Sequence, residues 1–457
     1  MKMEGLIMKV AKFGGSSLSN ATQIKKVADI VRNDRKIKFV VVSAPGKRDE
    51  EDTKVTDLLI ALHTNKIVNM DVEPIIQNIL NRYHSIIDEL HLDERILTYF
   101  KNRLHKYLDT ITDSDYLLDA LKSCGEDFNA LVVSEYLNNI GIESRYLSPE
   151  EAGITMTDNP GDAQLIPSSY DKISQLSNRK EVLVIPGFFG YTESGKIVTF
   201  SRGGSDITGA IVARGVGADV YENYTDVSYI YSAHPGIIKN PHPISEITYR
   251  EIRELSYSGF NVFHDEALQP LYEDKIPVII KNTNRPEDKG TRIVSERNDV
   301  NEYPVVGISG DAGFLSITIK RYLLNRQVGF LRRLLQAFED LDLSVEHVPT
   351  GIDDASIVLR SSQFENNNKL EELQEIIRQD LDPEWIHIEE NLAIIAIVGE
   401  GMRNTIGIAN KATEGFTKSG VSLRMINQGA SEISMFFSIP AKDLNKSIRF
   451  IYDEYFN

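Results

Sequence analysis

Two glycine-rich segments combine charged side chains with backbone groups that could hold an anion. The first is Lys12–Ser17 (KFGGSS) and the second is Ser201–Asp206 (SRGGSD). Glycines at a strand-to-helix turn let peptide N–H groups approach an anion, and the helix that follows adds the positive end of its dipole. Lys12 would supply a point charge for a phosphate, and Arg202 suits bidentate binding of a carboxylate. The alternative is two ordinary turns, with Asp206 only capping a helix, but finding two such turns in one domain weakens it.

Other polar residues stand at places where binding chemistry is common. Glu126 follows the tripeptide SCG (123–125) at a predicted helix start, where it could cap the helix or face a cleft and contact an ammonium group; taken alone, the cap is favoured. Thr225 and Asp226 follow a predicted strand, and groups at the carboxyl end of a strand are well placed to bind a ligand. Cys124 has no histidine near it in the sequence, so we expect a small buried residue rather than a nucleophile.

The segment Gly190–Lys196 (GYTESGK) has the spacing of a Walker A motif without its full composition. That motif requires Ser or Thr after the lysine, and Ile197 stands there instead. We expect a hairpin turn at Thr192–Lys196, between two strands. No G-x-G-x-x-G segment follows a predicted strand, which disfavours a Rossmann dinucleotide site.

An alternation of strands and helices in the first 300 residues must position these groups. Runs of β-branched residues predict buried strands, and amphipathic segments between them predict helices. The predicted strands are Val10–Phe13, Phe39–Ser43, Ser144–Leu147, Glu181–Pro186, Val220–Asn223 and Ile276–Lys281, and the predicted helices include Thr22–Arg32, Val55–Leu62, Glu126–Asn139 and Ile207–Val216. This pattern indicates an α/β fold with a largely parallel sheet covered on both faces, an α/β/α sandwich.

The last part of the chain contains an internal duplication. Ile317 aligns with Ile395 and Ser356 with Ser434, both at an offset of 78 residues (395 − 317 and 434 − 356). Each copy reads strand, helix, strand, strand, helix, which fits a ferredoxin-like βαββαβ unit once a fourth strand is added.

The second copy ends one strand short of that unit. We predict that the strand at Pro304–Ser309, just before the first copy, supplies the missing edge, and that Ser344–Val348 is the second strand of the first copy. The domains would then be 1–300 for the catalytic part, 301–390 for the first C-terminal copy and 391–457 for the second.

Composition excludes several classes of function. The 457 residues carry 50 Lys+Arg against 67 Asp+Glu, a formal net charge of −17, which disfavours partners such as nucleic acid or an anionic membrane. The single cysteine and the scattered histidines give no disulfide and no metal-ligand spacing. The N-terminus lacks the apolar core of a signal peptide, and no stretch is long enough for a membrane helix, so we expect a cytoplasmic protein.

Eight motifs stand in order along the catalytic part: KFGGSS (12–17), VVSAPGK (41–47), KVTDLL (54–59), SCGED (123–127), PGFFGYTESGK (186–196), SRGGSDITGA (201–210), TDVSYIYSAHP (225–235) and KNTNRPEDKGT (281–291). Together they resemble the aspartate kinases, of the amino acid kinase family. The paired C-terminal copies, including INQGASE (426–432), resemble the tandem ACT domains of that family. The resemblance implies an amino acid kinase fold followed by two ferredoxin-like ACT domains.

The resemblance also implies a reaction and its cofactors. ATP would phosphorylate the β-carboxylate of L-aspartate, giving 4-phospho-L-aspartate and ADP, at the entry to lysine, threonine and methionine biosynthesis. Mg²⁺ would ride on the ATP phosphates, with no metal held by the protein alone. A carboxylate is already ionised at neutral pH, so catalysis reduces to in-line positioning and neutralisation of charge.

Site residues are implied by the matching motifs. Lys12 and Asp206 would be catalytic, with Lys12 holding ATP phosphates and Asp206 orienting Lys12. The implied aspartate-binding residues are Ser43, Thr56, Glu126, Arg202 and Ser205, where Arg202 would meet the α-carboxylate and Glu126 the α-ammonium. The implied ATP-binding residues are Lys12, Gly14, Gly15, Ser16, Thr225, Asp226 and Tyr231.

Two positions depart from the family pattern on the nucleotide side. Gly236 stands where many members have an arginine, and Asn261 stands where many have a lysine. We expect weaker ATP affinity with activity retained, because Lys12 and the aspartate-side motifs are intact. Lys239 or Lys281 could substitute for the missing cations.

The resemblance further implies feedback regulation. An amino acid, lysine and/or threonine, would bind at the ACT domains and shift the enzyme between active and inactive assemblies. The implied lysine contacts are Gly329, Phe330, Leu331, Val345 and Glu346, with Glu346 facing the ligand ammonium; the alternative for Glu346 is a solvated strand residue. The protein would be a homo-oligomer, a dimer or a dimer of dimers formed through the ACT domains.

Two other functions remain as alternatives. One is a kinase of the same fold that acts on acetylglutamate, glutamate, carbamate or UMP, which the combination of motifs disfavours. The other is a catalytically silent amino-acid sensor, which the missing cations at Gly236 and Asn261 would explain.

Overall fold

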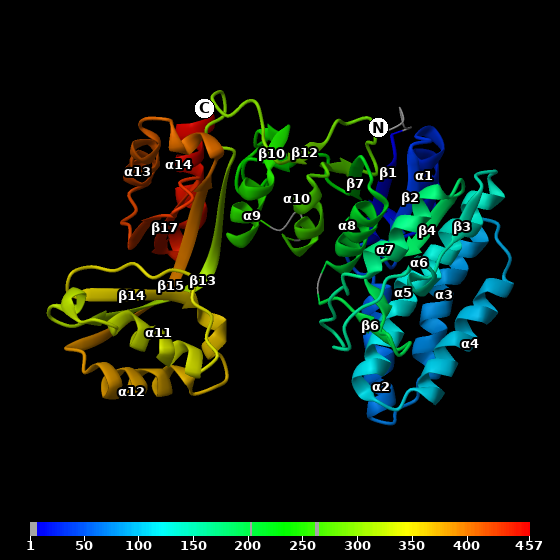
Figure 1. Ribbon diagram of the computed structural model, residues 1–457, viewed down its shortest axis with the longest axis horizontal. Helices are drawn as coiled ribbons and strands as arrows, with labels where there is room; N and C mark the ends of the chain where they lie inside the picture. Colours follow the sequence, from blue (N-terminus) through cyan, green and yellow to red (C-terminus); the bar gives the residue numbers. More distant parts are fainter. Residues whose placement is uncertain (1–6, 202, 261–264) are drawn as a thin grey trace. The chain divides into compact units, whose positions relative to one another are not determined.

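The computed structural model describes residues 7–201, 203–260 and 265–457, and their contacts divide the chain into two compact units. The first unit contains residues 7–230, 243–252 and 265–297, and the second contains 231–242, 253–260 and 298–457. Figure 1 follows the chain through both units. In the described ranges, no helix is both long and apolar enough to cross a membrane.

A mostly parallel sheet forms the centre of the first unit, as the strand pattern predicts. Its order is β10-β12-β11-β7-β1-β2-β4-β3, and among these described strands β11 and β12 run antiparallel to each other while the other neighbours run parallel. The strands are β1 (Lys9–Phe13), β2 (Ile37–Val42), β3 (Ser144–Tyr146), β4 (Val182–Pro186), β7 (Val220–Thr225), β10 (Glu246–Thr248), β11 (Val278–Asn282) and β12 (Thr291–Val294).

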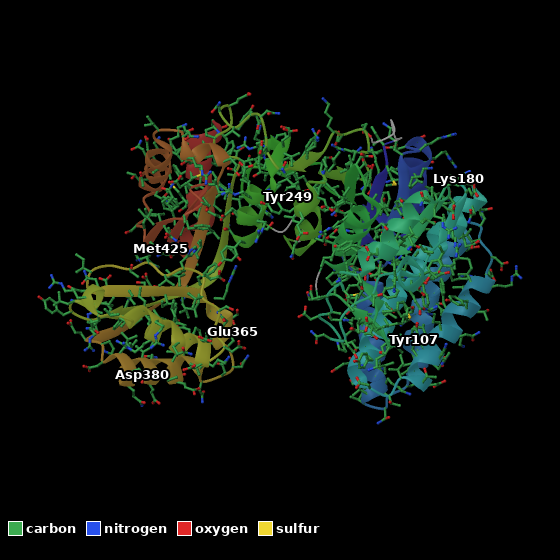
Figure 2. The ribbon with its side chains drawn as sticks, in the orientation of Figure 1. Tyr107, Lys180, Tyr249, Glu365, Asp380 and Met425 are labelled. Atoms are coloured by element: carbon green, nitrogen blue, oxygen red, sulfur yellow. The ribbon has the colours of Figure 1, made fainter. Side chains whose placement is uncertain are left out.

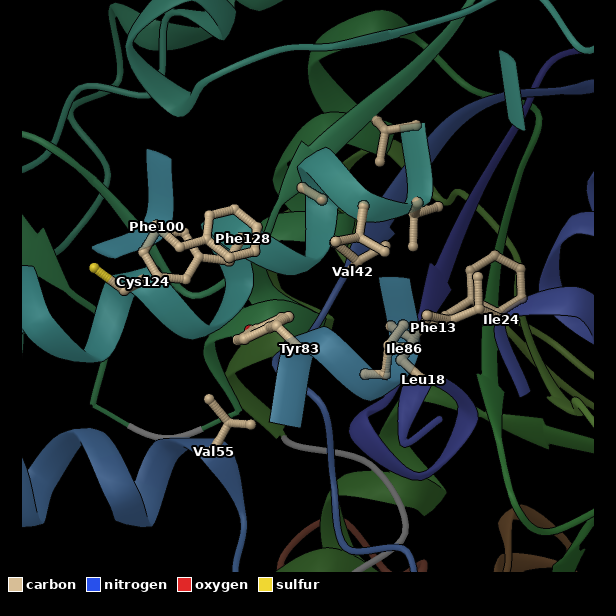
Figure 3. Packing of buried hydrophobic residues seen from close by; sticks show 14 of the residues in the cluster. Phe13, Leu18, Ile24, Val42, Val55, Tyr83, Ile86, Phe100, Cys124 and Phe128 are labelled. Carbon is tan, nitrogen blue, oxygen red and sulfur yellow. The ribbon is translucent and has the colours of Figure 1, made fainter. Parts of the chain in front are cut away.

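Helices cover this sheet on both faces, which confirms the predicted α/β class. They are α1 (Ala21–Asn33), α2 (Val55–Ile67), α3 (Glu73–Glu89), α4 (Arg95–Thr110), α5 (Ser114–Asn139), α6 (Pro149–Ala152), α7 (Ser169–Ser174), α8 (Gly204–Val216) and α10 (Gln269–Asp274), while α9 (Tyr249–Tyr257) runs along the chain from one unit into the other. Side chains on one face of the sheet pack with α1 to α5 in one cluster, in which Phe100 and Phe128 stack at 4.0 Å between ring centres (Figure 3). Cys124 is buried in the same cluster, as expected.

Strand alternation decides which way the functional lysine points. Ala11 and Phe13 enter the cluster with α1 to α5, so Lys12 between them projects to the opposite face. Helix α8 packs against β1 on that face. The sequence of β1 therefore places a charged residue beside the start of α8.

The hairpin predicted at Thr192–Lys196 is confirmed. Strands β5 (Phe189–Tyr191) and β6 (Ile197–Thr199) pair antiparallel, and Gly195 takes φ = +80° in the turn between them. The Walker-like spacing therefore belongs to a β-turn.

The predicted helix start at Glu126 is wrong. Helix α5 begins at Ser114, capped by Asp113, and runs through the whole SCG segment. Gly125 lies inside this helix. A side chain has no room there, because an added Cβ would stand 2.7 Å from the Cβ of Ala44. This glycine permits close packing against the turn after β2 and does not break the helix, so Glu126 cannot be a cap.

The helix predicted at Thr22–Arg32 is confirmed as α1, but a further short element separates it from the first glycine turn. A short 3₁₀ helix, η1 (Gly15–Leu18), follows Gly14, and α1 begins only at Ala21. Asn20 caps α1 by accepting a hydrogen bond from the Gln23 N–H at 3.0 Å. The N-terminus of α1 therefore does not directly follow the glycine pair, so the positive end of its dipole does not lie at that turn.

The second unit contains one antiparallel sheet in the order β14-β13-β15-β17-β16. Its strands are β13 (Gly307–Lys320), β14 (Asp354–Arg360), β15 (Trp385–Val398), β16 (Met425–Gln428) and β17 (Ser434–Pro440), and its helices include α11 (Phe330–Asp340), α12 (Lys369–Leu381), α13 (Ile408–Ser419) and α14 (Leu444–Phe456). Met425 of β16 and Asp380 of α12 are labelled in Figure 2. Two separate apolar clusters lie in this unit, one for each copy of the repeat.

Strands β13 and β15 run through both copies. The segment 307–312 of β13 pairs with 393–398 of β15, next to β17, while 316–320 pairs with 385–389, next to β14. The two copies therefore share one continuous sheet.

The regular strand predicted at Ser344–Val348 is absent from the described structure, where an isolated bridge joins His347 to Val358. The N–H groups of both Glu346 and His347 donate to the Val358 carbonyl, at 2.9 and 3.2 Å. Two residues opposite one break the ladder, as in a β-bulge.

Candidate active site

Lys12 and Asp206 form a buried ion pair in the first unit. The Lys12 ammonium lies 2.6 Å from Asp206 Oδ1, and Lys12 is only 7% exposed. Asp206 stands in the first turn of α8, where the helix dipole favours a negative charge. Gly203 before this helix takes φ = +62°, a left-handed conformation that glycine adopts without strain.

Asn223 completes this pair, and the sequence analysis missed it. It stands beside Lys12 in the register of β1 and β7, so both side chains leave the same face of the sheet. Its amide nitrogen donates to Asp206 Oδ1 at 2.8 Å. Its position near the end of a predicted strand could have pointed to it. An uncharged amide, however, does not stand out in a search for charged motifs.

A cleft of about 660 Å³ lies between the turns that follow β1 and β2. Its lining contains Gly15, Ser16, Ser43, Thr56, Glu126 and Asp226 from the predicted set, together with Ala44, Pro45, Gly46, Lys47, Arg48, Asp49, Glu50 and Lys54. Glycine allows the two turns to meet backbone to backbone. The Gly46 N–H donates to the Gly15 carbonyl at 2.9 Å, and a Cβ on Gly46 would stand 2.6 Å from the Gly15 carbonyl carbon.

Glu126 presents an unusual carboxylate to this cleft. It is 6% exposed, and its Oε2 has no hydrogen-bond partner among the described residues. Burial raises the pKa of Glu126 to about 8, against the opposing effects of backbone hydrogen bonds and of Lys122 and Lys12. A buried carboxylate with an unused oxygen is a suitable partner for an ammonium group.

The other predicted aspartate contacts surround Glu126 unevenly. Ser43 is held by a hydrogen bond from its N–H to the Phe13 carbonyl, at 3.1 Å, and its own carbonyl accepts from Asn129 at 2.7 Å. Thr56 lies in the first turn of α2 and lines the cleft. Ser205 is buried at the start of α8 against Gly187, outside the lining of the cleft.

Arg202 and Asn261 lie outside the described residues, so the predicted α-carboxylate contact and one of the missing cations have no structural counterpart here. Gly236 belongs to the second unit, where its N–H donates to His234 Nδ1 at 3.0 Å. Lys281 lies 5.7 Å from the centre of the Tyr224 ring and does not line the cleft.

The predicted nucleotide side is built at the carboxyl ends of β7 and β11. Thr225 ends β7 and donates to Asp226 Oδ1 at 3.1 Å, while the Asn282 amide donates to the Asp226 carbonyl at 3.1 Å. Gly14 is tied to β7 by its N–H, which donates to the Tyr224 carbonyl at 3.0 Å. Tyr231 falls in the second unit.

Three cations of the cleft wall were not singled out by the sequence analysis. They are Lys47, Arg48 and Lys54, which line the cleft on the side of the β2 turn. The signal was present in GKRDEEDTK (46–54), but such an alternation of charges is typical of a solvated loop. They stand there beside Asp49 and Glu50, so this wall carries charges of both signs and its cations are local exceptions in a chain of net charge −17.

The predicted effector residues lie at the start of α11 and near β14. Gly329 precedes α11 with φ = +78°, Phe330 is buried and Leu331 is partly exposed. Glu346 is half-buried, with one carboxylate oxygen 3.9 Å from Arg360 Nε; burial raises its pKa, although Arg360 opposes that shift. The carboxylate is therefore not a freely solvated strand residue. Val345 packs beside the apolar cluster of this copy.

The site offers groups for binding and for charge neutralisation. Within the described residues, no group of three or more His, Cys, Asp or Glu side chains could hold a metal ion. The lysine–aspartate pair, the glycine turn and the carboxylate of Glu126 are instead suited to holding two charged ligands side by side.

Comparisons with known proteins agree with this geometry. The model of the amino acid kinase family matches residues 8–282, and that of the ACT domain matches residues 395–455. Aspartokinase 3 of Bacillus subtilis is 45% identical over 450 residues, which are 98% of this chain and 99% of that protein.

Solved structures show the same fold over the whole chain. The aspartate kinase of Clostridium acetobutylicum matches with a TM-score of 0.84 at 38% identity, covering 98% of this chain and 100% of that one. Escherichia coli aspartokinase III, solved with aspartate and ADP and with lysine and aspartate, matches with TM-scores of 0.75 and 0.72 at 23% identity, covering 98% of this chain and 100% of each. The family model, the full-length relative and the shared fold together lead to one conclusion: this chain belongs to the aspartokinases of the amino acid kinase family and carries a C-terminal ACT region.

Proposed function

We propose that this aspartokinase transfers the γ-phosphoryl group of ATP to the β-carboxylate of L-aspartate at the cleft between the β1 and β2 turns. The observation that carries the proposal is the buried pair of Lys12 and Asp206, 2.6 Å apart, beside a cleft that also contains Glu126. A fixed lysine next to a glycine turn can neutralise the charge that spreads over the transferred group.

Each residue has one task in this scheme. Glu126 and Arg202 bind the α-ammonium and α-carboxylate of aspartate, while Ser43, Thr56 and Ser205 contribute hydroxyl or backbone groups to the same substrate. Gly15 and Ser16 offer N–H groups to the phosphates, and Gly14, whose own N–H is bonded to Tyr224, lets the backbone come close to them. Thr225, Asp226 and Tyr231 contact the rest of the nucleotide. Asp206 orients Lys12, and Asn223 holds Asp206.

ATP enters as its magnesium complex, so Mg²⁺ belongs to the substrate. Lys47, Arg48 and Lys54 lie on the cleft wall and are the described cations best placed to offset the charges absent at Gly236 and Asn261. We expect these three residues to affect the KM for ATP more than kcat, because they would contact the phosphates without touching the transferred group.

The ACT region is proposed to regulate this activity. Lysine and/or threonine would bind there, as the complex of the E. coli enzyme with lysine suggests, and the assembly would be a dimer or a dimer of dimers formed through the ACT domains. The proposed domains are 1–300, 301–390 and 391–457, in an enzyme that works in the cytoplasm on the route to lysine, threonine and methionine.

A substrate panel tests the proposal. Purified enzyme, MgATP and hydroxylamine are incubated with L-aspartate, L-glutamate, N-acetyl-L-glutamate or UMP, and hydroxamate and ADP are measured with and without lysine and threonine. We expect hydroxamate with L-aspartate only. Product with another acceptor and none with aspartate would favour a different kinase of this fold, and no turnover with any acceptor would favour a silent sensor.

A further inference from the structure

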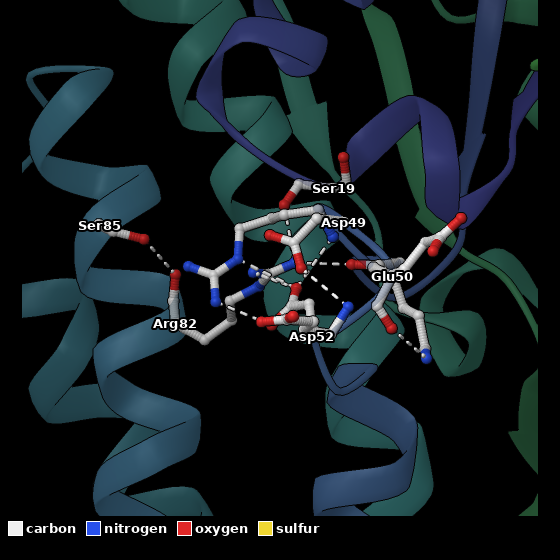
Figure 4. Close-up of polar contacts among 10 residues, drawn as sticks. Ser19, Asp49, Glu50, Asp52, Arg82 and Ser85 are labelled. Atoms are coloured by element: carbon white, nitrogen blue, oxygen red, sulfur yellow. Dashed lines mark hydrogen bonds and ion pairs between the residues drawn. The ribbon is translucent and has the colours of Figure 1, made fainter.

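Arg82 is a buried cation of α3 that contacts Gly46 in the wall of the active-site cleft and two residues behind that wall, Ser19 and Asp52. Its Nη2 donates to the Ser19 carbonyl at 3.0 Å and to the Gly46 carbonyl at 2.6 Å, and its Nη1 lies 2.7 Å from Asp52 Oδ2 (Figure 4). The Arg82 side chain is 4% exposed. One guanidinium of α3 therefore joins two segments that are far apart in the sequence, the turn at Ser19 and the 46–52 loop.

These segments continue from the two turns that form the cleft. Ser19 follows η1, which begins at the phosphate-side glycine Gly15. Gly46 and Asp52 bracket the loop that brings Lys47 and Arg48 to the cleft wall. Arg82 thus holds both segments from behind the cleft.

The far end of the loop is held by a second arginine. Arg48 donates to both oxygens of Asp52, at 3.0 and 2.8 Å. Burial raises the pKa of Asp52, but the hydrogen bonds from Arg48 outweigh it and leave that pKa below its usual value. Asp52 therefore stays ionised and connects Arg82 to a residue that lines the cleft.

We propose that Arg82 is a positioning residue of the kinase reaction, which holds the glycine turn and the 46–52 loop at the spacing that phosphoryl transfer requires. This inference rests on the proposed function. Two ligands must meet in line across the cleft, and a shift of about 1 Å between its walls can cost about a hundredfold in rate. The turns meet at Gly15 and Gly46, where there is no room for a side chain, and the bond from Arg82 to the Gly46 carbonyl holds one side of this contact.

The neighbouring residue on α3 separates positioning from packing. Tyr83 points into the apolar cluster, where it packs against Phe100 and Phe128, whereas the polar contacts of Arg82 go to the cleft wall and to the two residues behind it. A change in the cluster should lower stability alone, and a change at Arg82 should also alter kinetics.

The test compares Arg82→Gln, Arg82→Lys and Asp52→Asn with the core variant Phe100→Leu and the surface variant Arg95→Gln, whose side chain is 91% exposed. For each, kcat and the KM values for aspartate and ATP are measured well below the thermal midpoint, with the folded fraction determined separately. We expect kcat/KM to fall at least about tenfold in Arg82→Gln and less in Arg82→Lys. The kcat/KM of Asp52→Asn should also fall. Phe100→Leu should lose stability and keep the wild-type kinetic constants.

Wild-type kinetics for Arg82→Gln, with a lowered midpoint like that of Phe100→Leu, would overturn the inference. If Arg82→Gln does not fold, wild-type kinetics in both Arg82→Lys and Asp52→Asn would overturn the inference. Absence of aspartate phosphorylation in the wild-type enzyme would instead contradict the proposed function, so the two failures are distinguishable.

Discussion

Single residues in this site are defined by what remains unpaired as much as by what is paired. Lys12 and Asp206 form an ion pair, whereas Glu126 is buried, has a pKa of about 8 and has one carboxylate oxygen without a hydrogen-bond partner among the described residues. Such a carboxyl releases its proton when a cation arrives, which couples substrate binding to pH. Glu126 therefore gives the site a property that can be measured without a bound structure.

The first prediction concerns that coupling. Glu126 loses its proton near pH 4.5 in the unfolded chain and near pH 8 in the ligand-free folded enzyme. Its contribution to the free energy of unfolding is therefore complete below about pH 4.5 and is lost as the pH rises towards 8. Binding of the aspartate ammonium to ionised Glu126 should improve over the same range. We expect the KM for aspartate to fall as pH is raised from about 6.5 to about 8.5.

Glu126→Gln should raise that KM and flatten its dependence on pH, because the amide carries no titrating charge. The matched control is Glu135→Gln, which changes an exposed glutamate on the same helix and should keep the wild-type profile. An unchanged pH profile in Glu126→Gln would show that another group controls aspartate binding.

At the scale of elements, the site depends on how closely the turns after β1 and β2 approach. Gly46 and Gly15 touch through their backbones, and Gly125 of α5 brings Ala44 within reach of the same cleft. None of these glycines needs a positive φ; each is required by a neighbour that leaves no space for a Cβ.

The second prediction tests that contact. An alanine at position 46 would place its Cβ 2.6 Å from a backbone carbon, which cannot move away as a flexible side chain could. We expect Gly46→Ala to lower kcat/KM by about tenfold or more through separation of the two turns. Gly429→Ala is the control, since its Cβ would meet only serine hydroxyls at 3.6 and 3.7 Å and should leave kinetics unchanged. Wild-type kinetics in Gly46→Ala would mean that the spacing of the turns does not matter.

The sequence predicted the elements well where local pattern and fold agree. The apolar runs of β1, β2 and β4, the hairpin at Thr192–Lys196 and the α/β class were all recognisable, because buried parallel strands leave a continuous apolar signature. Glu126 was misplaced because Gly125 reads locally as a helix boundary. Position 125 requires glycine because of a tertiary contact with Ala44, and a local sequence pattern does not contain that information.

Contacts between distant segments account for most of the rest. Arg82 reads as one polar residue of an amphipathic helix, yet its partners stand 63 and 36 residues away at Ser19 and Gly46. The bulge at Glu346 arises from pairing with Val358, so its sequence resembles an ordinary strand. Charge runs such as 46–54 are ambiguous for the same reason, since only the fold tells a cleft wall from a solvated loop.

At the scale of the whole molecule, residues 307–457 form one sheet from two repeats. Strands β13 and β15 run through both copies, so the two copies share a continuous backbone connection along which an effector bound to one copy would act on the other. Glu346 lies at the bulge between β14 and the residues before it, a point where pairing is already irregular.

The third prediction concerns the effector. A ligand ammonium would compete with Arg360 for the half-buried carboxylate of Glu346, which lies 3.9 Å from it. We expect Glu346→Gln to raise the lysine concentration for half-inhibition by about tenfold, the size of one lost charged hydrogen bond. Glu375→Gln, which changes an exposed glutamate of α12, is the control and should keep the wild-type inhibition curve. Wild-type inhibition in Glu346→Gln would place the effector elsewhere.

The central claim is that Lys12 is the charge at which phosphoryl transfer takes place. Its most direct test is the rate of ADP release with saturating L-aspartate and MgATP in wild type, Lys12→Met and Lys196→Met. The last variant removes the lysine of the Walker-like hairpin and should retain full activity. We predict that Lys12→Met folds and loses activity by at least about a hundredfold. A folded Lys12→Met that keeps the wild-type rate would contradict the account.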